Sequence, residues 1–193
     1  GIIEGKIKDK RWIVDPIDGT FNFLNGLPHF AISIAYEEKN EIISGIIFDP
    51  IKNEMFFGEK GKGAYLNNSR IRVSNKKSLK ESMLVTGGPR RNSKKRENIF
   101  KEYNNISNIV DIPIRKFGSA ALDLANVACG RFDGFWQWEL SYWDIAAGLI
   151  IIEESGGFVD FLEKDEKTLA KKNIIATNSK IHEELKNALE KKY

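Results

Sequence analysis

The chain has 193 residues with 41% hydrophobic and 30% charged residues, an ordinary balance for a globular protein with one core or two lobes. Its net charge of +3 does not call for nucleic acid, and its apolar runs are too short for a membrane span or a signal peptide. One cysteine, Cys129, excludes an internal disulfide and favours a reducing, cytoplasmic location, and two histidines leave little for a zinc site or a Ser-His-Asp triad.

Short strands dominate the expected structure of the first half. An apolar run at 12–14 predicts one strand, and the alternation of large and small residues over 30–38 predicts a half-buried second strand. The nearly continuous apolar run 42–48 predicts a central strand. Residues 55–74, which are punctuated by glycines, predict an antiparallel meander with tight hairpins.

Helices and strands alternate in the second half. The expected elements are a strand at 83–86, a helix at 89–105, a helix at 118–130, a strand at 132–138, a helix at 143–154, strands at 158–160 and 174–176, and a helix from 181. This alternation favours layers of helices and sheets. We expect a strand-rich lobe at 1–112, N-terminally incomplete, which binds metal and phosphate, and an α/β lobe at 113–193.

The segment "WIVDPIDGTFNF" places two carboxylates, Asp15 and Asp18, at the end of a strand. Gly19 permits a left-handed turn, and Thr20 is a good N-cap for the segment that follows. Two close carboxylates repel unless a cation binds between them, and such hard oxygen ligands suit Mg²⁺. The free N–H groups of Gly19 and Thr20 suit a phosphate. The pattern therefore suggests phosphoryl chemistry, although Asp-Pro and Asp-Gly pairs are also common in plain turns.

A third acidic residue, Asp144, falls in the first turn of the apolar helix in "SYWDIAAGLIII", where Ser141 is a candidate cap. An acidic residue in a first turn ordinarily complements the helix dipole and has no other role. However, the small residues Ala146, Ala147 and Gly148 permit close packing against another element. We expect that packing to bring Asp144 to the strand end that carries the other two carboxylates.

Two segments, "DPIDGT" at 15–20 and "WDIAAG" at 143–148, match the signature motifs of the inositol monophosphatase family. The chain resembles the bacterial members most, and "GKGAYLN" and "GSAALDLANVACGRFDGFW" extend the resemblance over nearly the whole chain. The resemblance implies an α/β (α+β) fold, a layered α-β-α-β-α sandwich of the sugar-phosphatase type. It also implies a Mg²⁺-dependent, lithium-sensitive phosphomonoesterase that hydrolyses inositol-1-phosphate, or a related small polyol or sugar phosphate, by means of a metal-activated water.

The same resemblance implies roles for individual residues. The implied metal ligands are Asp15, the carbonyl of Ile17, Asp18 and Asp144. The implied phosphate-binding residues are Gly19 and Thr20, and the Thr20 hydroxyl would help to orient the attacking water. The implied substrate-binding residues are Gly118, Ser119, Ala120 and Gln137. Of these, the residues implied in catalysis are Asp15, Asp18, Thr20 and Asp144.

The chain also departs from the family pattern. The family carries two helices and a metal-binding Gly-Glu-Glu element before the position of Gly1, so we expect an N-terminally truncated member that lacks the helical pair. We therefore expect fewer than the two or three Mg²⁺ ions of the family. Gln137 stands where the family has a glutamate, and Phe21 where it usually has threonine. Apolar sheet surface left uncovered by missing helices predicts a homodimer.

Two other functions stay open. The first is a phosphatase of the same superfamily that acts on fructose-1,6-bisphosphate or a nucleotide 3′-phosphate. The second is a catalytically impaired member that binds the transcription machinery or RNA through a basic cluster at 90–96. That cluster contains Arg90, Arg91, Lys94, Lys95 and Arg96. The plainer interpretation of the cluster is a solvated helix face.

Overall fold

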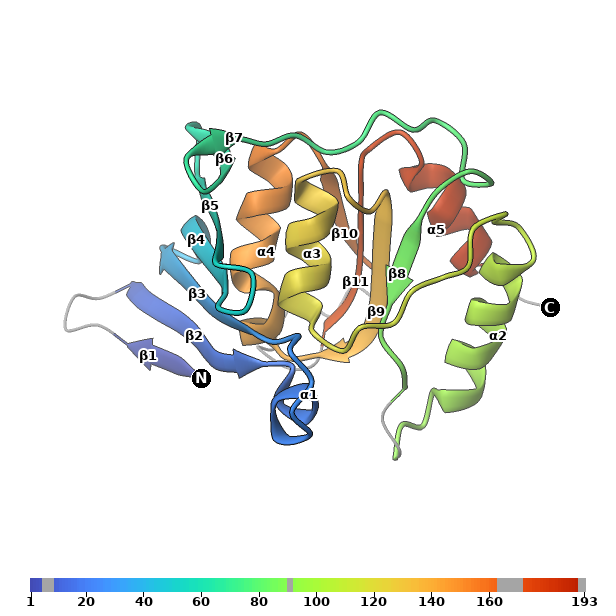
Figure 1. Ribbon diagram of the computed structural model, residues 1–193, viewed down its shortest axis with the longest axis horizontal. Coiled ribbons are helices and arrows are strands. Elements are labelled where there is room, and N and C mark those ends of the chain that lie inside the picture. The colour runs from blue at the N-terminus through green and yellow to red at the C-terminus, as the bar shows by residue number, and fades with distance from the viewer. Residues whose placement is uncertain (5–8, 90–91, 163–171, 191–193) are drawn as a thin grey trace.

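Two β-sheets and their helices form four layers in the computed structural model, which describes residues 1–4, 9–89, 92–162 and 172–190 (Figure 1). A seven-stranded sheet forms one outer layer, and helices α3 (Ala120–Ala128) and α4 (Tyr142–Glu154) separate it from a four-stranded sheet. Helices α2 (Arg96–Ser107) and α5 (His182–Glu190) cover the far side of the second sheet. The layering confirms the α+β sandwich that the sequence predicts.

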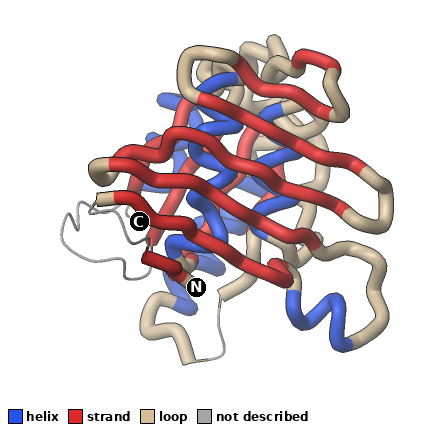
Figure 2. The backbone as a smooth tube through the Cα atoms, turned by 90° about the vertical axis from the view of Figure 1, so that its left-hand side faces the viewer, coloured by secondary structure: helices blue, strands red, loops and turns tan. Residues whose placement is uncertain are grey.

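The first sheet is antiparallel throughout, and its strands follow one another in chain order. Its strands are β1 (Ile2–Glu4), β2 (Lys10–Asp18), β3 (Ala31–Glu38), β4 (Glu41–Asp49), β5 (Glu54–Glu59), β6 (Gly63–Leu66) and β7 (Ser69–Arg70). The expected strand at 12–14 is longer in the structure, and β4 is central as predicted. Figure 2 shows one face of this sheet turned toward the viewer.

The second sheet has the strand order β10-β11-β9-β8, in which β8 runs parallel to β9 and the other pairs are antiparallel. Its strands are β8 (Leu84–Thr86), β9 (Gly134–Leu140), β10 (Phe158–Phe161) and β11 (Lys172–Thr177). The sequence predicts the approximate position of each of these strands. The strand β9 leads directly into α4, so this sheet delivers the chain to the first turn that carries Asp144.

Helix α2 begins at Arg96, and the expected start at residue 89 is wrong. The Ser93 hydroxyl accepts a hydrogen bond from the Lys95 N–H at 3.1 Å. Such a local bond from side chain to backbone competes with helix formation and delays the helix start. Arg90 and Arg91, which belong to the expected basic cluster, lie outside the described residues.

Helix α4 is buried because it lies between the two sheets (Figure 1). A methyl group on Gly45 of β4 would lie 2.8 Å from both Cα and the carbonyl oxygen of Ala147. A methyl group on Gly148 would lie 2.5 Å from Cδ1 of Leu124 in α3. Only residues without side chains permit this approach, so glycines on the sheet and on the helix set the position of α4.

The larger hydrophobic core joins the first sheet to α3 and α4, and it includes Ile13 and Ile47 together with Leu124 and Ile151. A second core, which includes Trp136, Ile175 and Leu185, lies between the second sheet and its outer helices. The division into lobes at residue 112 stays a prediction. Among the described helices, none combines the length and the apolar character that a membrane crossing requires.

Candidate active site

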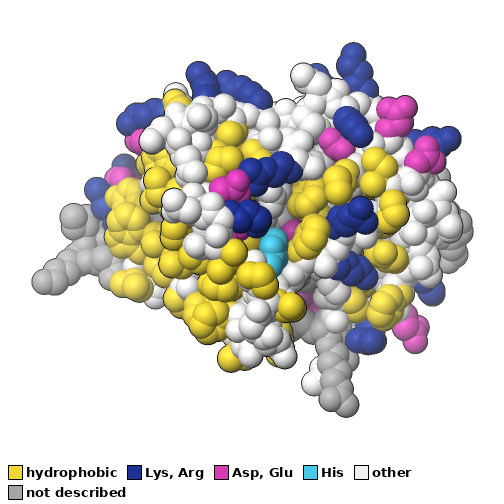
Figure 3. All heavy atoms as spheres, in the orientation of Figure 1, with side chains coloured by type: hydrophobic (Ala, Val, Ile, Leu, Met, Phe, Trp, Pro, Cys, Tyr) yellow, Lys and Arg dark blue, Asp and Glu magenta, His cyan; other side chains and the backbone are white. Residues whose placement is uncertain are grey.

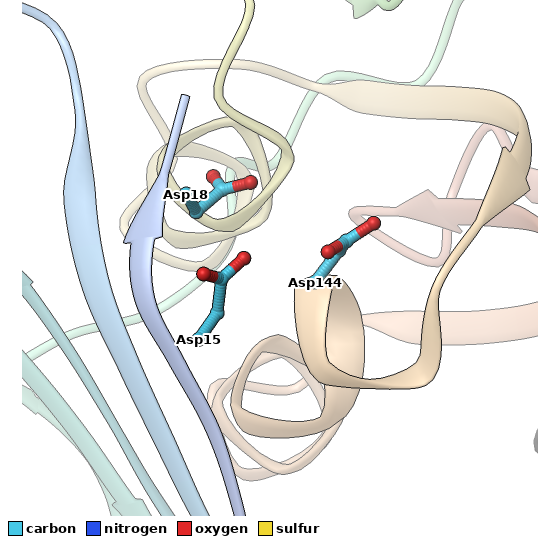
Figure 4. Close-up of side chains that lie close together, drawn as sticks. All are labelled: Asp15, Asp18 and Asp144. Carbon is cyan, nitrogen blue, oxygen red and sulfur yellow. The ribbon is translucent and has the colours of Figure 1, made fainter. Parts of the chain in front are cut away.

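Three carboxylates converge where β2 ends and α4 begins. Asp15, Asp18 and Asp144 each offer an oxygen atom, and these atoms all lie within 4.8 Å of one another. Figure 4 shows Asp15 and Asp18 on the strand facing Asp144 in the first turn of the helix. The expected convergence is confirmed. Asp144 is far from Asp15 and Asp18 in the chain, so the fold itself creates the cluster.

Strand β2 is irregular between Asp15 and Asp18, and local hydrogen bonds hold this stretch. The Ile17 N–H donates to Oδ1 of Asp15 at 3.1 Å, and the Thr20 hydroxyl donates to the Ile17 carbonyl at 2.9 Å. Gly19 has a φ of +88°, and it is the N-cap of the short helix α1 (Thr20–Leu24). The expectation that Thr20 would be the N-cap is therefore wrong by one residue, because the left-handed turn places Gly19 there.

Asp18 lies at the N-terminus of α3, a contact that the sequence did not predict. Its Oδ2 atom accepts hydrogen bonds from the Ser119 hydroxyl and from the Ala121 N–H, the latter at 2.9 Å. Ser119 is also the N-cap of α3, as the Gly-Ser pair before the helix indicates. The N-terminal end of a helix favours a negative charge. Ser119, which we expected in the substrate pocket, thus orients a candidate metal ligand.

Burial raises the pKa of Asp18 from its ordinary value to about 7, although hydrogen bonds from Ser119 and Ala121 oppose the shift. The neighbouring charges of Asp144 and Asp15 raise this pKa further. Without a cation, Asp18 is therefore partly protonated near neutral pH. A divalent cation removes this repulsion, so cation binding should displace the proton and strengthen as the pH rises through 7.

Asp144 is held by the first turn of α4. Its Oδ2 atom accepts a hydrogen bond from the Ser141 N–H at 2.8 Å, in a capping-box arrangement that confirms Ser141 as the cap. Each carboxylate in the cluster has further lone pairs beyond the hydrogen bonds described above. Three carboxylates and the Ile17 carbonyl form a set of hard oxygen donors, which fits Mg²⁺ or another oxygen-preferring divalent cation.

The remaining residues expected at the site are Gly118, Ala120 and Gln137, and the structure gives the surroundings of each. Gly118 has a φ of +86°, and it adjoins the side chain of Asn22 in α1. Ala120 is buried at the start of α3. Gln137 lies in β9, and its side chain fills the space over Gly87, where a methyl group would be 2.1 Å from Cδ of the glutamine. Gln137 therefore packs against Gly87, the residue that follows β8.

Asn22 is a supporting residue that sequence reasoning missed. Its Nδ2 group donates to the carbonyl of His29 at 2.8 Å and to the carbonyl of Phe117 at 2.7 Å. These bonds tie α1 to the loop before β3 and to the loop before α3. The only signal in the sequence is a polar residue within the apolar segment "TFNFL".

A buried acid, Asp123, lies in α3 near the cluster. Burial, together with the charge of Asp18, raises its pKa well above the ordinary value. Within the part of the chain that the structure describes, its Oδ1 atom has no hydrogen-bond partner. A neutral acid is therefore expected here, and we assign Asp123 no role as a metal ligand.

Hydrophobic side chains gather on the surface around α1, at the lower left of Figure 3. Phe21, Leu24 and Leu27 are exposed, and 84% of Phe21 is accessible.

Of the expected basic cluster, Lys95 lies 4.7 Å from the ring centre of Trp138 and Arg96 lies over Phe100. The homodimer and the RNA-binding alternative stay predictions.

Comparisons with known proteins identify the family. The model of the inositol monophosphatase family matches residues 2–192. An inositol-1-monophosphatase of Mesorhizobium japonicum is 43% identical over 191 residues, which cover 99% of this chain and 71% of the relative. The Nus factor SuhB of Haemophilus influenzae is 44% identical over 98% of this chain and 70% of its own. The crystal structure of the extragenic suppressor protein SuhB from Bartonella henselae superposes with a TM-score of 0.92 at 45% identity, covering 99% of this chain and 74% of that one.

Proposed function

The chain belongs to the inositol monophosphatase family, and from this premise we propose that it is a Mg²⁺-dependent phosphomonoesterase with inositol-1-phosphate as its first candidate substrate. Related small polyol or sugar phosphates are the wider substrate class. The observation that carries the proposal is the convergence of Asp15, Asp18 and Asp144 within 4.8 Å. Carboxylates gathered in this way repel one another, so they favour the binding of a divalent cation and, through it, of a phosphate.

The three aspartates and the Ile17 carbonyl would hold the cation. When bound, Mg²⁺ supplies a positive charge that stabilises the entering and leaving oxygens of the displacement and makes a water molecule more acidic. A ligand for the cation needs a fixed orientation and a free lone pair. Ser119 and Ala121 fix one carboxylate oxygen of Asp18 and leave the other available. The Ser141 N–H donates a hydrogen bond to Oδ2 of Asp144 and so orients that carboxylate.

Thr20 would orient the water that attacks the phosphorus. Its hydroxyl proton is donated to the Ile17 carbonyl at 2.9 Å, so the lone pairs of its oxygen remain available. Those lone pairs can accept a hydrogen bond from a water molecule and direct its oxygen toward the phosphate. The backbone N–H groups of Gly19 and Thr20, at the start of α1, would bind the phosphate oxygens.

The test is phosphate release by the purified chain from inositol-1-phosphate, fructose-1,6-bisphosphate and a nucleotide 3′-phosphate, with Mg²⁺ and with chelator. We expect hydrolysis that requires Mg²⁺, with the highest kcat/KM for inositol-1-phosphate. A higher value for another substrate would move the proposal to that substrate. Absence of Mg²⁺-dependent release from all three would contradict the proposed function.

A further inference from the structure

The buried carboxylate of Glu37 lies outside the acidic cluster, but it connects β2 and α4, the two elements that form the cluster. Glu37, on β3, is only 2% exposed. Its Oε1 atom accepts a hydrogen bond from Nε of Arg11 and forms an ion pair with Nη2 of the same residue, and its Oε2 atom accepts a hydrogen bond from the Tyr142 hydroxyl at 2.7 Å. Both oxygens of the carboxylate are thus engaged. A buried charge is tolerated only with such partners.

The partners of Glu37 lie on the same two elements as the metal-ligand candidates. Arg11 is on β2, directly opposite Glu37 in the strand pairing, and it precedes Asp15 by four residues on the same face of the strand. Tyr142 is the first residue of α4, two positions before Asp144. The hydrogen bonds of Glu37 therefore join the strand that carries Asp15 to the helix that carries Asp144.

The contacts that α4 makes with the first sheet elsewhere do not fix its first turn. At the last residue of the helix, Glu154 accepts hydrogen bonds from the Gly61 and Gly63 N–H groups, both at 2.7 Å, and these bonds hold the opposite end. The middle of the helix makes close approaches of apolar and small residues, such as the contact of Gly45 with Ala147. Packing of this sort fixes the distance between the helix and the sheet, but it is not directional. A hydrogen bond to a charged acceptor is short, directional and about twice as strong as one between neutral groups. The Tyr142–Glu37 bond is thus suited to fix the first turn of α4 along the strand direction.

We propose that Glu37, held by Arg11, is a positioning residue for the candidate metal site and acts through Tyr142 to keep Asp144 within ligating distance of Asp15. The inference rests on the proposed function, since it assumes that the cluster binds a divalent cation. Glu37 touches neither the cation nor the substrate. Its effect is to reduce the reorganisation of the first turn when the cation binds.

The Tyr142→Phe variant tests the proposal because it removes only the hydroxyl and leaves the Glu37–Arg11 pair intact. Tyr36→Phe is a matched control on the same strand as Glu37, since the Tyr36 hydroxyl donates to Glu38 at 3.2 Å. Titration with Tb³⁺, an oxygen-preferring ion whose emission a nearby residue such as Trp143 can sensitise, reports affinity independently of activity. We expect Tyr142→Phe to weaken Tb³⁺ binding by about 3- to 10-fold, and Tyr36→Phe to leave it unchanged.

Thermal unfolding of the metal-free variants separates positioning from general stability. If Tyr142→Phe lowers the Tm but binds Tb³⁺ as tightly as Tyr36→Phe does, the positioning role is overturned while the proposed function stands. If the unsubstituted chain neither binds Tb³⁺ nor hydrolyses a phosphate ester, the proposed function fails as well. A second variant, Glu37→Gln, retains an oxygen that can accept a hydrogen bond from Tyr142. We expect its affinity for Tb³⁺ to be closer to that of the unsubstituted chain than the affinity of Glu37→Ala is.

Discussion

Replacement of Asp144 by asparagine should lower kcat/KM for Mg²⁺-dependent hydrolysis by about a thousandfold, because it removes one of three charges that face the cation. An asparagine oxygen can still accept the hydrogen bond that the Ser141 N–H donates to Asp144 at 2.8 Å. The cap of α4 is therefore retained, and the free energy of unfolding should change by less than about 1 kcal/mol. Steady-state kinetics with inositol-1-phosphate and urea denaturation measure the two effects.

The control for this substitution is Asp111→Asn. Asp111 is exposed, and its contact with Lys80 is a long ion pair of 4.0 Å, so its loss should alter neither activity nor stability measurably. Full activity in Asp144→Asn would show that the carboxylate has no part in the reaction. A large loss of stability in that variant would instead show that the cap of α4 depends on the charge of the carboxylate.

The Gly45→Ala substitution should cause the largest loss of stability for the smallest chemical change. The added methyl group would lie 2.8 Å from two backbone atoms of Ala147, and backbone atoms of a buried helix cannot move aside without moving the helix. We expect a decrease in the free energy of unfolding of about 1–3 kcal/mol. We also expect lower activity, because displacement of α4 carries Asp144 away from Asp15.

Gly88→Ala is the matched control, since a methyl group on Gly88 would have no atom of the described residues within 4 Å beyond its neighbours in the chain. Urea denaturation of both variants and of the unsubstituted chain provides the comparison. Equal stability of Gly45→Ala and Gly88→Ala would mean that α4 tolerates displacement from the sheet. The contact of Gly45 with Ala147 would then not set the position of α4.

The sequence predicts well those features that depend on local chemistry. The Asp15–Asp18 pair is visible because a strand, a turn and a glycine with a left-handed conformation follow one another within a few residues. Asp144 could be assigned to the same site because small residues beside it indicate close packing of its helix. Strand β3 was predicted from its alternation of side chains, which reflects one buried and one less buried face, and β4 from its nearly continuous apolar run.

Contacts between distant segments could not be predicted in this way. Ser119 lies 101 positions from Asp18, and Tyr142 lies 105 positions from Glu37. In the sequence Glu37 looks like an ordinary charged residue near the end of a strand, and only the antiparallel pairing with Arg11 and the placement of α4 explain its burial. The start of α2 was missed for a local reason, the hydrogen bond of the Ser93 hydroxyl.

Calorimetric titration of Mg²⁺ into the unsubstituted chain and into Asp144→Asn tests most directly whether the three aspartates form a metal site. The titration belongs at pH 8, above the pKa of about 7 of Asp18, where a proton no longer competes for the carboxylate. We predict saturable binding to the unsubstituted chain and its loss in Asp144→Asn. No binding to the unsubstituted chain, or binding of equal affinity in the variant, would contradict the assignment of the site.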